Sequence, residues 1–182
     1  MKPIRTERGE VRVYEDANEV ARAGADEYAR TVAGVLADHN RAFVALAGGN
    51  TPKAMYKLLA TPAWRDRVEW PRIEIFFGDE RCVPPDHEES NYRMARQALL
   101  DHVPLAAAVH VQKLDSWRVT LTAPVLSAAA HVIFTVVGAD KADAFATAML
   151  DPLGTVPVQL VRAPQQLWLV DRAAAQKWLA RL

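Results

Sequence analysis

The sequence predicts an α/β fold with a mainly parallel β-sheet. Short apolar runs at Phe43–Ala47, Ile73–Phe77 and Val132–Val137 are typical of buried strands. Segments with helical periodicity lie between them, and strands that alternate with helices indicate β-α-β units. A length of 182 residues favours one domain with a sizeable core. We therefore expect a single α/β domain over residues 1–182.

Composition excludes several classes of partner and site. The chain has 22 basic and 22 acidic residues, so its net charge offers no general attraction to nucleic acid. Its single cysteine, Cys82, excludes an intramolecular disulfide and a cysteine-based zinc site. The N-terminus lacks the apolar core of a signal peptide, and no apolar run approaches the roughly twenty residues of a membrane span. We expect a cytoplasmic protein without nucleic-acid or membrane partners.

A turn between a strand and a helix is the first candidate binding site. Phe43–Ala47 is expected to be a strand buried on both faces, and Gly48 and Gly49 to end it. Thr51 is expected to be the N-cap of the next helix, with Pro52 as the first helical residue. Glycine allows close approach of the backbone, while free N–H groups and the helix dipole favour an anion. The pattern predicts a phosphate cradle; an ordinary strand-to-helix turn is the alternative, because neither common nucleotide motif is matched.

The remaining elements follow the same alternation. A long amphipathic helix is expected at Ala17–His39, capped by Asp16 or Asn18, and a helix capped by Ser90 at Asn91–Asp101. Trp64 and Trp70 are interpreted as packing residues, and the histidines as structural or solvated. The other expected elements are extended segments at Arg12–Tyr14, Val109–Val111, Val158–Val161 and Leu167–Val170, and helices that begin near Thr122 and Asp140. Asp171 is expected to cap the closing helix.

Asp79 and Arg81 form a second candidate site, just after the strand Ile73–Phe77. Ligands of open parallel sheets gather beyond the carboxyl ends of the strands, so we expect these residues at the same edge as Gly48–Thr51. A carboxylate there can act as a base or orient one, and an arginine can hold phosphate through two hydrogen bonds. A solvated turn is the alternative, since acids and arginines are common in loops.

The ordered series of motifs resembles the 6-phosphogluconolactonase family. The resemblance is carried by LAGGNTPKAMYKLL, FFGDERCVPPDHEESNYRMARQALLDHV, VHVQKL, RVTLTAPVLSAAAHVIFTVVGADKADAF and LWLVDRAAA. It implies a doubly wound, mainly parallel, Rossmann-like sheet with helices on both faces, related to glucosamine-6-phosphate deaminases and ribose-5-phosphate isomerases. It also implies hydrolysis of 6-phospho-D-glucono-1,5-lactone to 6-phosphogluconate in the oxidative pentose phosphate pathway, without a metal or an organic cofactor.

The resemblance also implies roles for individual residues. Those of the phosphate loop would be Gly48, Gly49, Asn50 and Thr51, and those of the sugar site and catalytic cluster Arg81, Asn91 and Asp79. Lys141, in GADKA, would add a cation at the same end of the sheet. A helix start is a poor place for a cation because the dipole there is positive, so a bound anion explains Lys141 better than a plain surface lysine does.

One part of the family pattern is absent between Leu114 and Arg118. The family carries a strand that ends in Gly-x-Gly-x-Asp-Gly-His-x-x-x-Leu-Phe-Pro, and the resemblance implies that its histidine is the general base. Here only Asp115, Ser116 and Trp117 join the flanking runs, and none of the five histidines follows a Gly-Asp-Gly sequence. A strand, its crossover helix and a loop need about thirty or more residues. The segment is omitted from the sequence, deleted by engineering, or lost in a naturally shortened relative.

Three functions remain open at this point. The leading hypothesis is a lactone hydrolase whose partner is a small phosphorylated sugar lactone, favoured by the GDERCVPP and SNYRMA motifs. A catalytically impaired sugar-phosphate-binding homologue is the second, because loss of a general base typically lowers the rate about a hundredfold to ten-thousandfold. An amino-sugar phosphate deaminase or isomerase is the third. The sequence makes no prediction of oligomeric state.

Overall fold

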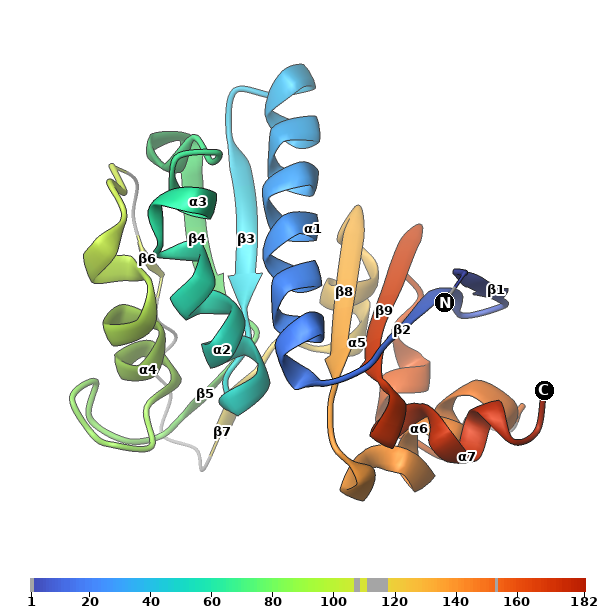
Figure 1. Ribbon diagram of the computed structural model, residues 1–182. Helices are drawn as coiled ribbons and strands as arrows, with labels where there is room; N and C mark the ends of the chain where they lie inside the picture. Colours follow the sequence, from blue (N-terminus) through green and yellow to red (C-terminus); the bar gives the residue numbers. More distant parts are fainter. Residues whose placement is uncertain (1, 107–108, 111–117, 153) are drawn as a thin grey trace. The chain divides into compact units, whose positions relative to one another are not determined.

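The computed structural model describes residues 2–106, 109–110, 118–152 and 154–182 (Figure 1). The chain divides into two compact units by its internal contacts. Unit 1 comprises Met1–Gly24 and Thr122–Leu182, and unit 2 comprises Ala25–Leu121. The positions of the units relative to one another are not determined, and each is described by itself. None of the described helices is both long and apolar enough to cross a membrane.

Unit 2 is built on a parallel sheet with strand order β3-β4-β6. These strands are β3 (Ala42–Leu46), β4 (Ile73–Phe77) and β6 (Val109–His110). The register runs from Ala42 opposite Ile73 to Leu46 opposite Phe77, so β3 and β4 end at the same edge, as their arrowheads in Figure 1 show. The other elements of this unit are the later part of α1 (Ala17–Asp38), α2 (Asn50–Leu59), α3 (Pro62–Arg65), η1 (Trp70–Arg72), α4 (Asn91–Ala98), η2 (Leu100–His102), and the antiparallel pair β5 (Asp79–Arg81) and β7 (Arg118–Thr120).

The core of unit 2 lies on one face of this sheet. Strand β4 buries every second side chain completely, and Trp70, which is 1% exposed, stacks on Tyr28 with ring centroids 5.8 Å apart. The prediction that Trp70 is a packing residue is confirmed. The expectation that Phe43–Ala47 is buried on both faces is wrong, because Phe43 is 68% exposed; its ring lies beside that of Phe76, with the ring centroids 6.2 Å apart. Strand β3 alternates because only one of its faces meets this core.

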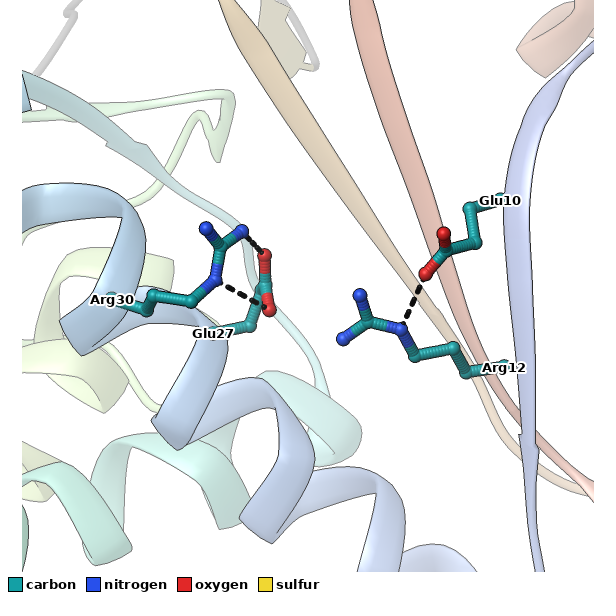
Figure 2. Close-up of polar contacts among 4 residues, drawn as sticks. All are labelled: Glu10, Arg12, Glu27 and Arg30. Carbon is teal, nitrogen blue, oxygen red and sulfur yellow. Dashed lines mark hydrogen bonds and ion pairs between the residues drawn. The ribbon is translucent and has the colours of Figure 1, made fainter. Parts of the chain in front are cut away.

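Helix α1 begins at a side-chain cap. Asp16 Oδ1 accepts the backbone N–H groups of Asn18 at 2.8 Å and Glu19 at 2.9 Å, so Asp16 is the capping residue of the two that were predicted. Further along α1, Glu27 is buried and forms an ion pair with Arg30 on the next turn, as Figure 2 shows. Burial of a charge is costly unless it is paired, and Arg30 supplies the opposite charge.

Unit 1 contains a mixed sheet with strand order β1-β2-β9-β8. Strands β2, β9 and β8 are parallel, and β1 is antiparallel to β2. On β2, Arg12 Nε donates to Glu10 Oε1 at 2.6 Å (Figure 2). The elements of this unit are β1 (Ile4–Thr6), β2 (Gly9–Tyr14), α5 (Ala123–Ser127), β8 (His131–Val136), η3 (Ala139–Lys141), α6 (Ala142–Leu150), η4 (Pro157–Leu160), β9 (Gln165–Asp171) and α7 (Arg172–Leu179).

Aromatic packing holds the helices of unit 1 against its sheet. Trp168 stacks on Phe134 with centroids 4.0 Å apart and contacts Phe145 at 5.9 Å, while Trp178 meets the edge of Phe145 at 5.5 Å. Asp171 ends β9 and accepts the N–H of Ala174 at 2.8 Å, which confirms it as the cap of α7.

The structure confirms a mixed α/β fold in which parallel strands alternate with helices. The described strands pair into three sheets, and these pairings do not join the parallel strands into the single doubly wound sheet that was expected. Some elements differ from prediction: the extended segment at Val158–Val161 lies largely in the 3-10 turn η4, and the helix from Asn91 ends at Ala98 rather than Asp101. Asp79–Arg81 form the further strand β5. The predicted junction after Leu114 falls outside the described residues.

Candidate functional site

The turn after β3 places a helix N-terminus beside open space. Gly49 is the N-cap of α2, with φ of 101° and ψ of 172°, and no side chain caps this helix. The prediction of Thr51 as N-cap is therefore wrong, because the backbone turns into the helix at a left-handed φ that favours glycine. A Cβ on Gly49 would meet no atom within 4 Å. Among the described residues, the N–H groups of Gly49, Asn50 and Thr51 have no hydrogen-bond acceptor, as is usual in a first helical turn.

Tyr56 fixes the end of β3 against helix α2. Its hydroxyl accepts the N–H of Ala47 and donates to the carbonyl of Ala47, both at 2.9 Å. Tyr56 is 1% exposed, and this burial raises the pKa of its hydroxyl, so the proton that it donates is retained. The backbone N–H and the backbone carbonyl of Ala47, just before the turn, are thus both hydrogen-bonded to Tyr56. Nothing in the local sequence pattern singles out Tyr56, apart from the need of a buried tyrosine for a polar partner.

Gly48 brings this turn into contact with Asn91 at the start of α4. A Cβ on Gly48 would overlap Oδ1 and Cγ of the Asn91 carboxamide, so only glycine fits at this distance. Asn91 is 1% exposed, and its Nδ2 donates to the backbone oxygen of Asp79 at 2.9 Å and to Asp79 Oδ1 at 3.1 Å. The Asn91 carboxamide therefore connects the turn to the predicted catalytic acid.

Glu80 holds the first turn of α4 in place. Its carboxylate is buried and accepts four hydrogen bonds, from the N–H groups of Arg81 at 2.8 Å, Asn91 at 2.7 Å and Tyr92 at 2.7 Å, and from the Ser90 hydroxyl at 3.2 Å. The N–H groups of Asn91 and Tyr92 lie in the first turn of α4 and have no acceptor within the helix itself, so Glu80 supplies one. A negative charge at a helix N-terminus is stabilising. Ser90 also accepts the N–H of Arg93 at 3.1 Å, as expected for the N-cap of this helix.

Sequence reasoning missed Glu80 because residues 79–81 were expected to follow the end of a strand and not to form one. They form strand β5, which pairs with β7 so that Asp79 lies opposite Thr120 and Arg81 opposite Arg118. Successive side chains of a strand point to opposite faces, so Glu80 faces away from its two neighbours. A strand assignment would have separated one inward carboxylate from the two residues on the other face.

Arg81 is half-buried at the end of β5. One of its terminal nitrogens donates to the carbonyl of Glu89 at 2.7 Å, which anchors the acidic loop before α4. Its Nε is buried and has no hydrogen-bond partner within the described part of the chain. A guanidinium has five N–H donors, so Arg81 keeps donor capacity for an anionic or polar ligand.

Lys141 belongs to unit 1, whereas the other predicted site residues belong to unit 2. It is the last residue of η3, is exposed, and pairs with Asp140 at 2.7 Å between Nζ and Oδ2. The hydrogen bond from Lys141 is the main reason why the pKa of Asp140 is lowered. The structure therefore brings together Gly48–Thr51, Asp79 and Asn91, places Arg81 on the same strand as Asp79, and leaves the role of Lys141 as a prediction.

No group of three histidine, cysteine or acidic side chains among the described residues is arranged to hold a metal ion. His39, His87 and His102 are exposed. His87 Nδ1 accepts the N–H of Glu89 at 3.2 Å, and a ring nitrogen of His102 lies 3.0 Å from the carbonyl of Gln97. These three histidines make local contacts at loops and helix ends.

Comparison with known families accounts for this arrangement. The sequence profile of a family described as "Glucosamine-6-phosphate isomerases/6-phosphogluconolactonase" matches residues 15–115 and 104–170. The chain belongs to this family. A "6-phosphogluconolactonase" of Synechocystis sp. PCC 6803 is 47% identical over 73 residues, which are 40% of this chain and 29% of that protein. The chain thus matches less than a third of the length of that relative.

Two longer matches extend over nearly the whole family member. The "6-phosphogluconolactonase" of Mycobacterium tuberculosis H37Rv is 25% identical over an alignment of 242 residues, covering 92% of this chain and 97% of that protein. Because that alignment is longer than the 182 residues of this chain, it contains residues that have no counterpart here. A 6-phosphogluconolactonase structure from Trypanosoma brucei has a TM-score of 0.76 and 19% identity, over 96% of this chain and 99% of that one, and it shows the shared fold.

Proposed function

We propose that this family member hydrolyses 6-phospho-D-glucono-1,5-lactone to 6-phosphogluconate, a step of the oxidative pentose phosphate pathway. The observation that carries the proposal is the contact of Gly48 with Asn91, whose carboxamide also binds Asp79. This contact supports a site in which a turn suited to an anion lies close to a carboxylate, as binding and opening of a phosphorylated lactone would use. The names of the relatives point to the same reaction.

The phosphate of the substrate would bind at the N-terminus of α2. The unpaired N–H groups of Gly49, Asn50 and Thr51 and the helix dipole favour an anion, and the open space above Gly49 admits one. Arg81 would donate to the sugar or its phosphate through guanidinium N–H groups other than its buried Nε. Lys141 is kept in the proposal as a phosphate-binding cation because of the family resemblance of the GADKA motif.

Asp79 would act on the water that opens the lactone. Water adds to the carbonyl carbon, its proton passes to a base that Asp79 forms or orients, and the ring C–O bond breaks as the ring oxygen takes up a proton. The products are a carboxylic acid and a hydroxyl group on one open sugar chain. Asn91 would keep the Asp79 carboxylate oriented through its hydrogen bond to Oδ1. Donors that stabilise the tetrahedral oxyanion would supply much of the rate enhancement.

The domain assignment belongs to the same proposal. We infer one doubly wound α/β domain over residues 1–182 that lacks a segment of its relatives between Leu114 and Arg118. Two observations support a shortened chain. The family profile matches in two parts, residues 15–115 and 104–170, which overlap at 104–115. The alignment with the Mycobacterium tuberculosis protein spans 242 residues, more than the length of this chain. The same observations favour the second candidate, a sugar-phosphate-binding homologue with weak activity. We further propose a cytoplasmic protein without nucleic-acid partners.

A lactone-opening assay tests the proposal. Acid release from 6-phosphogluconolactone is followed at constant pH and corrected for spontaneous opening, after mass spectrometry of the intact protein has verified the Leu114-to-Arg118 junction. Hydrolysis that Asp79→Asn abolishes supports the lactonase. Binding of 6-phosphogluconate without hydrolysis supports the binding homologue, and ammonia release from glucosamine 6-phosphate would support the deaminase. Absence of all three contradicts the proposal.

A further inference from the structure

We propose that Glu80 is a positioning residue for this reaction, because its buried carboxylate seats helix α4 so that Asn91 can hold Asp79 beside the phosphate-binding turn. The inference rests on the proposed function, which it deepens by one residue that does not touch the substrate. It is carried by two linked sets of contacts, those that Glu80 makes and those that Asn91 makes.

The carboxylate of Glu80 accepts four hydrogen bonds, and three of their donors lie at the start of α4. Oε1 accepts the N–H of Asn91 and that of its own neighbour on β5, Arg81, and Oε2 accepts the N–H of Tyr92 and the hydroxyl of Ser90. Glu80 is 5% exposed, so these bonds replace water that the carboxylate has lost. Hydrogen bonds to a charged acceptor are stronger than neutral ones, and the three from Ser90, Asn91 and Tyr92 fix the start of α4 relative to β5.

Asn91 transmits this position to the site. Its backbone N–H is bound to Glu80, while its carboxamide lies between Gly48 and Asp79. Movement of the first turn of α4 would therefore move the carboxamide away from both partners. A misplacement of about 1 Å in a catalytic group can lower the rate about a hundredfold.

Strand alternation explains why Glu80 acts indirectly. Asp79 and Arg81 lie on one face of β5, and Glu80 lies on the other, toward α4. Its role differs from a purely structural one, because the helix turn that it seats carries a side chain of the site. A structural role alone would change stability without changing the geometry at Gly48.

Glu80→Gln is the decisive substitution because it keeps the size of the side chain. The new NH2 group must face at least one backbone N–H that Glu80 now accepts, so the first turn of α4 loses part of its anchor. We expect kcat for lactone opening to fall about tenfold to hundredfold, with KM changed less than about threefold, since only the reacting geometry is disturbed.

Arg72→Ala is the matched control. Arg72 donates to the carbonyls of Leu36 at 3.0 Å, His39 at 2.8 Å and Asn40 at 2.9 Å, just before the amino end of β4. Its loss should lower the melting temperature and leave kcat unchanged at temperatures below unfolding. If Glu80→Gln lowers kcat no more than Arg72→Ala does, the inference is overturned.

A second readout does not depend on activity. The amide NMR signal of Gly48 should shift in Glu80→Gln and stay in place in Arg72→Ala, because only the first change reaches the Asn91 carboxamide. If the wild-type chain does not open the lactone, the proposed function fails, and the Gly48 amide signal alone tests the positioning role of Glu80. A Gly48 signal that does not shift in Glu80→Gln overturns that role. Should Glu80→Gln not fold, Ser90→Ala, which removes one of the four donors, must give the same shift at reduced size, and no shift again overturns the inference.

Discussion

Replacing Gly48 by alanine tests the contact on which the site depends. The added methyl group would overlap the carboxamide of Asn91, which is 1% exposed and is held by two hydrogen bonds to Asp79. Overpacking of a buried site costs about 1–3 kcal/mol, and each hydrogen bond lost if the carboxamide moves costs about 0.5–1.5 kcal/mol. We expect the free energy of unfolding to fall by about 2–6 kcal/mol if both hydrogen bonds are lost, which lowers the melting temperature by about 2–4 °C per kcal/mol in a chain of this size.

The same substitution at Gly34 is the control. Gly34 lies in α1, where an added Cβ would meet no atom within 4 Å, so Gly34→Ala makes no new contact. Alanine is favoured over glycine within a helix by about 0.5–1 kcal/mol, and this variant should be slightly more stable than wild type, with unchanged activity. The two Gly→Ala changes are therefore expected to have opposite signs.

Thermal unfolding by circular dichroism gives the stability of each variant, and calorimetric titration with 6-phosphogluconate gives its affinity for the product. Gly48→Ala should lower both the melting temperature and the affinity, and it should lower lactone opening as Asp79 loses its orienting partner. A Gly48→Ala protein with wild-type melting temperature and activity would refute the packing of Asn91 on Gly48 and, with it, the joint placement of the cradle and the acid.

Two further predictions concern charge and protonation. Lys141→Ala should weaken binding of 6-phosphogluconate severalfold with little loss of stability, since its ion pair with Asp140 is exposed to solvent and contributes little. Lys177→Ala on the same unit should leave the affinity unchanged, and equal affinities of the two variants would remove Lys141 from the site. Burial raises the pKa of Tyr28 and of Tyr56 above the usual value of 10, so the unfolded chain loses these protons at lower pH than the folded chain, and stability should decline as pH rises above about 10. Absorbance at 295 nm should show both phenols ionising only on unfolding, and their ionisation in the intact fold would contradict the burial.

Strand and helix positions followed from the sequence because their signals are local. Ile73–Phe77 was predicted at its observed limits, since an apolar run between punctuating residues depends only on its own composition. Asp16, Ser90 and Asp171 were predicted as caps, and each accepts a backbone N–H of the helix that follows. A side chain and the backbone two or three residues later are close in any helix start.

The sequence alone also indicated which stretches form the candidate site, because a glycine pair at a helix start and an acid after a strand are local patterns. It could not show that Gly48 meets Asn91, that Glu80 is buried beneath α4, or that Tyr56 ties down the turn, because these contacts join residues that lie 9 to 43 positions apart. The tertiary structure decided them: parallel pairing of β3 with β4 brings their carboxyl ends to one edge, and α4 packs there. Chain pattern determines which residues are available, and three-dimensional packing determines which of them meet.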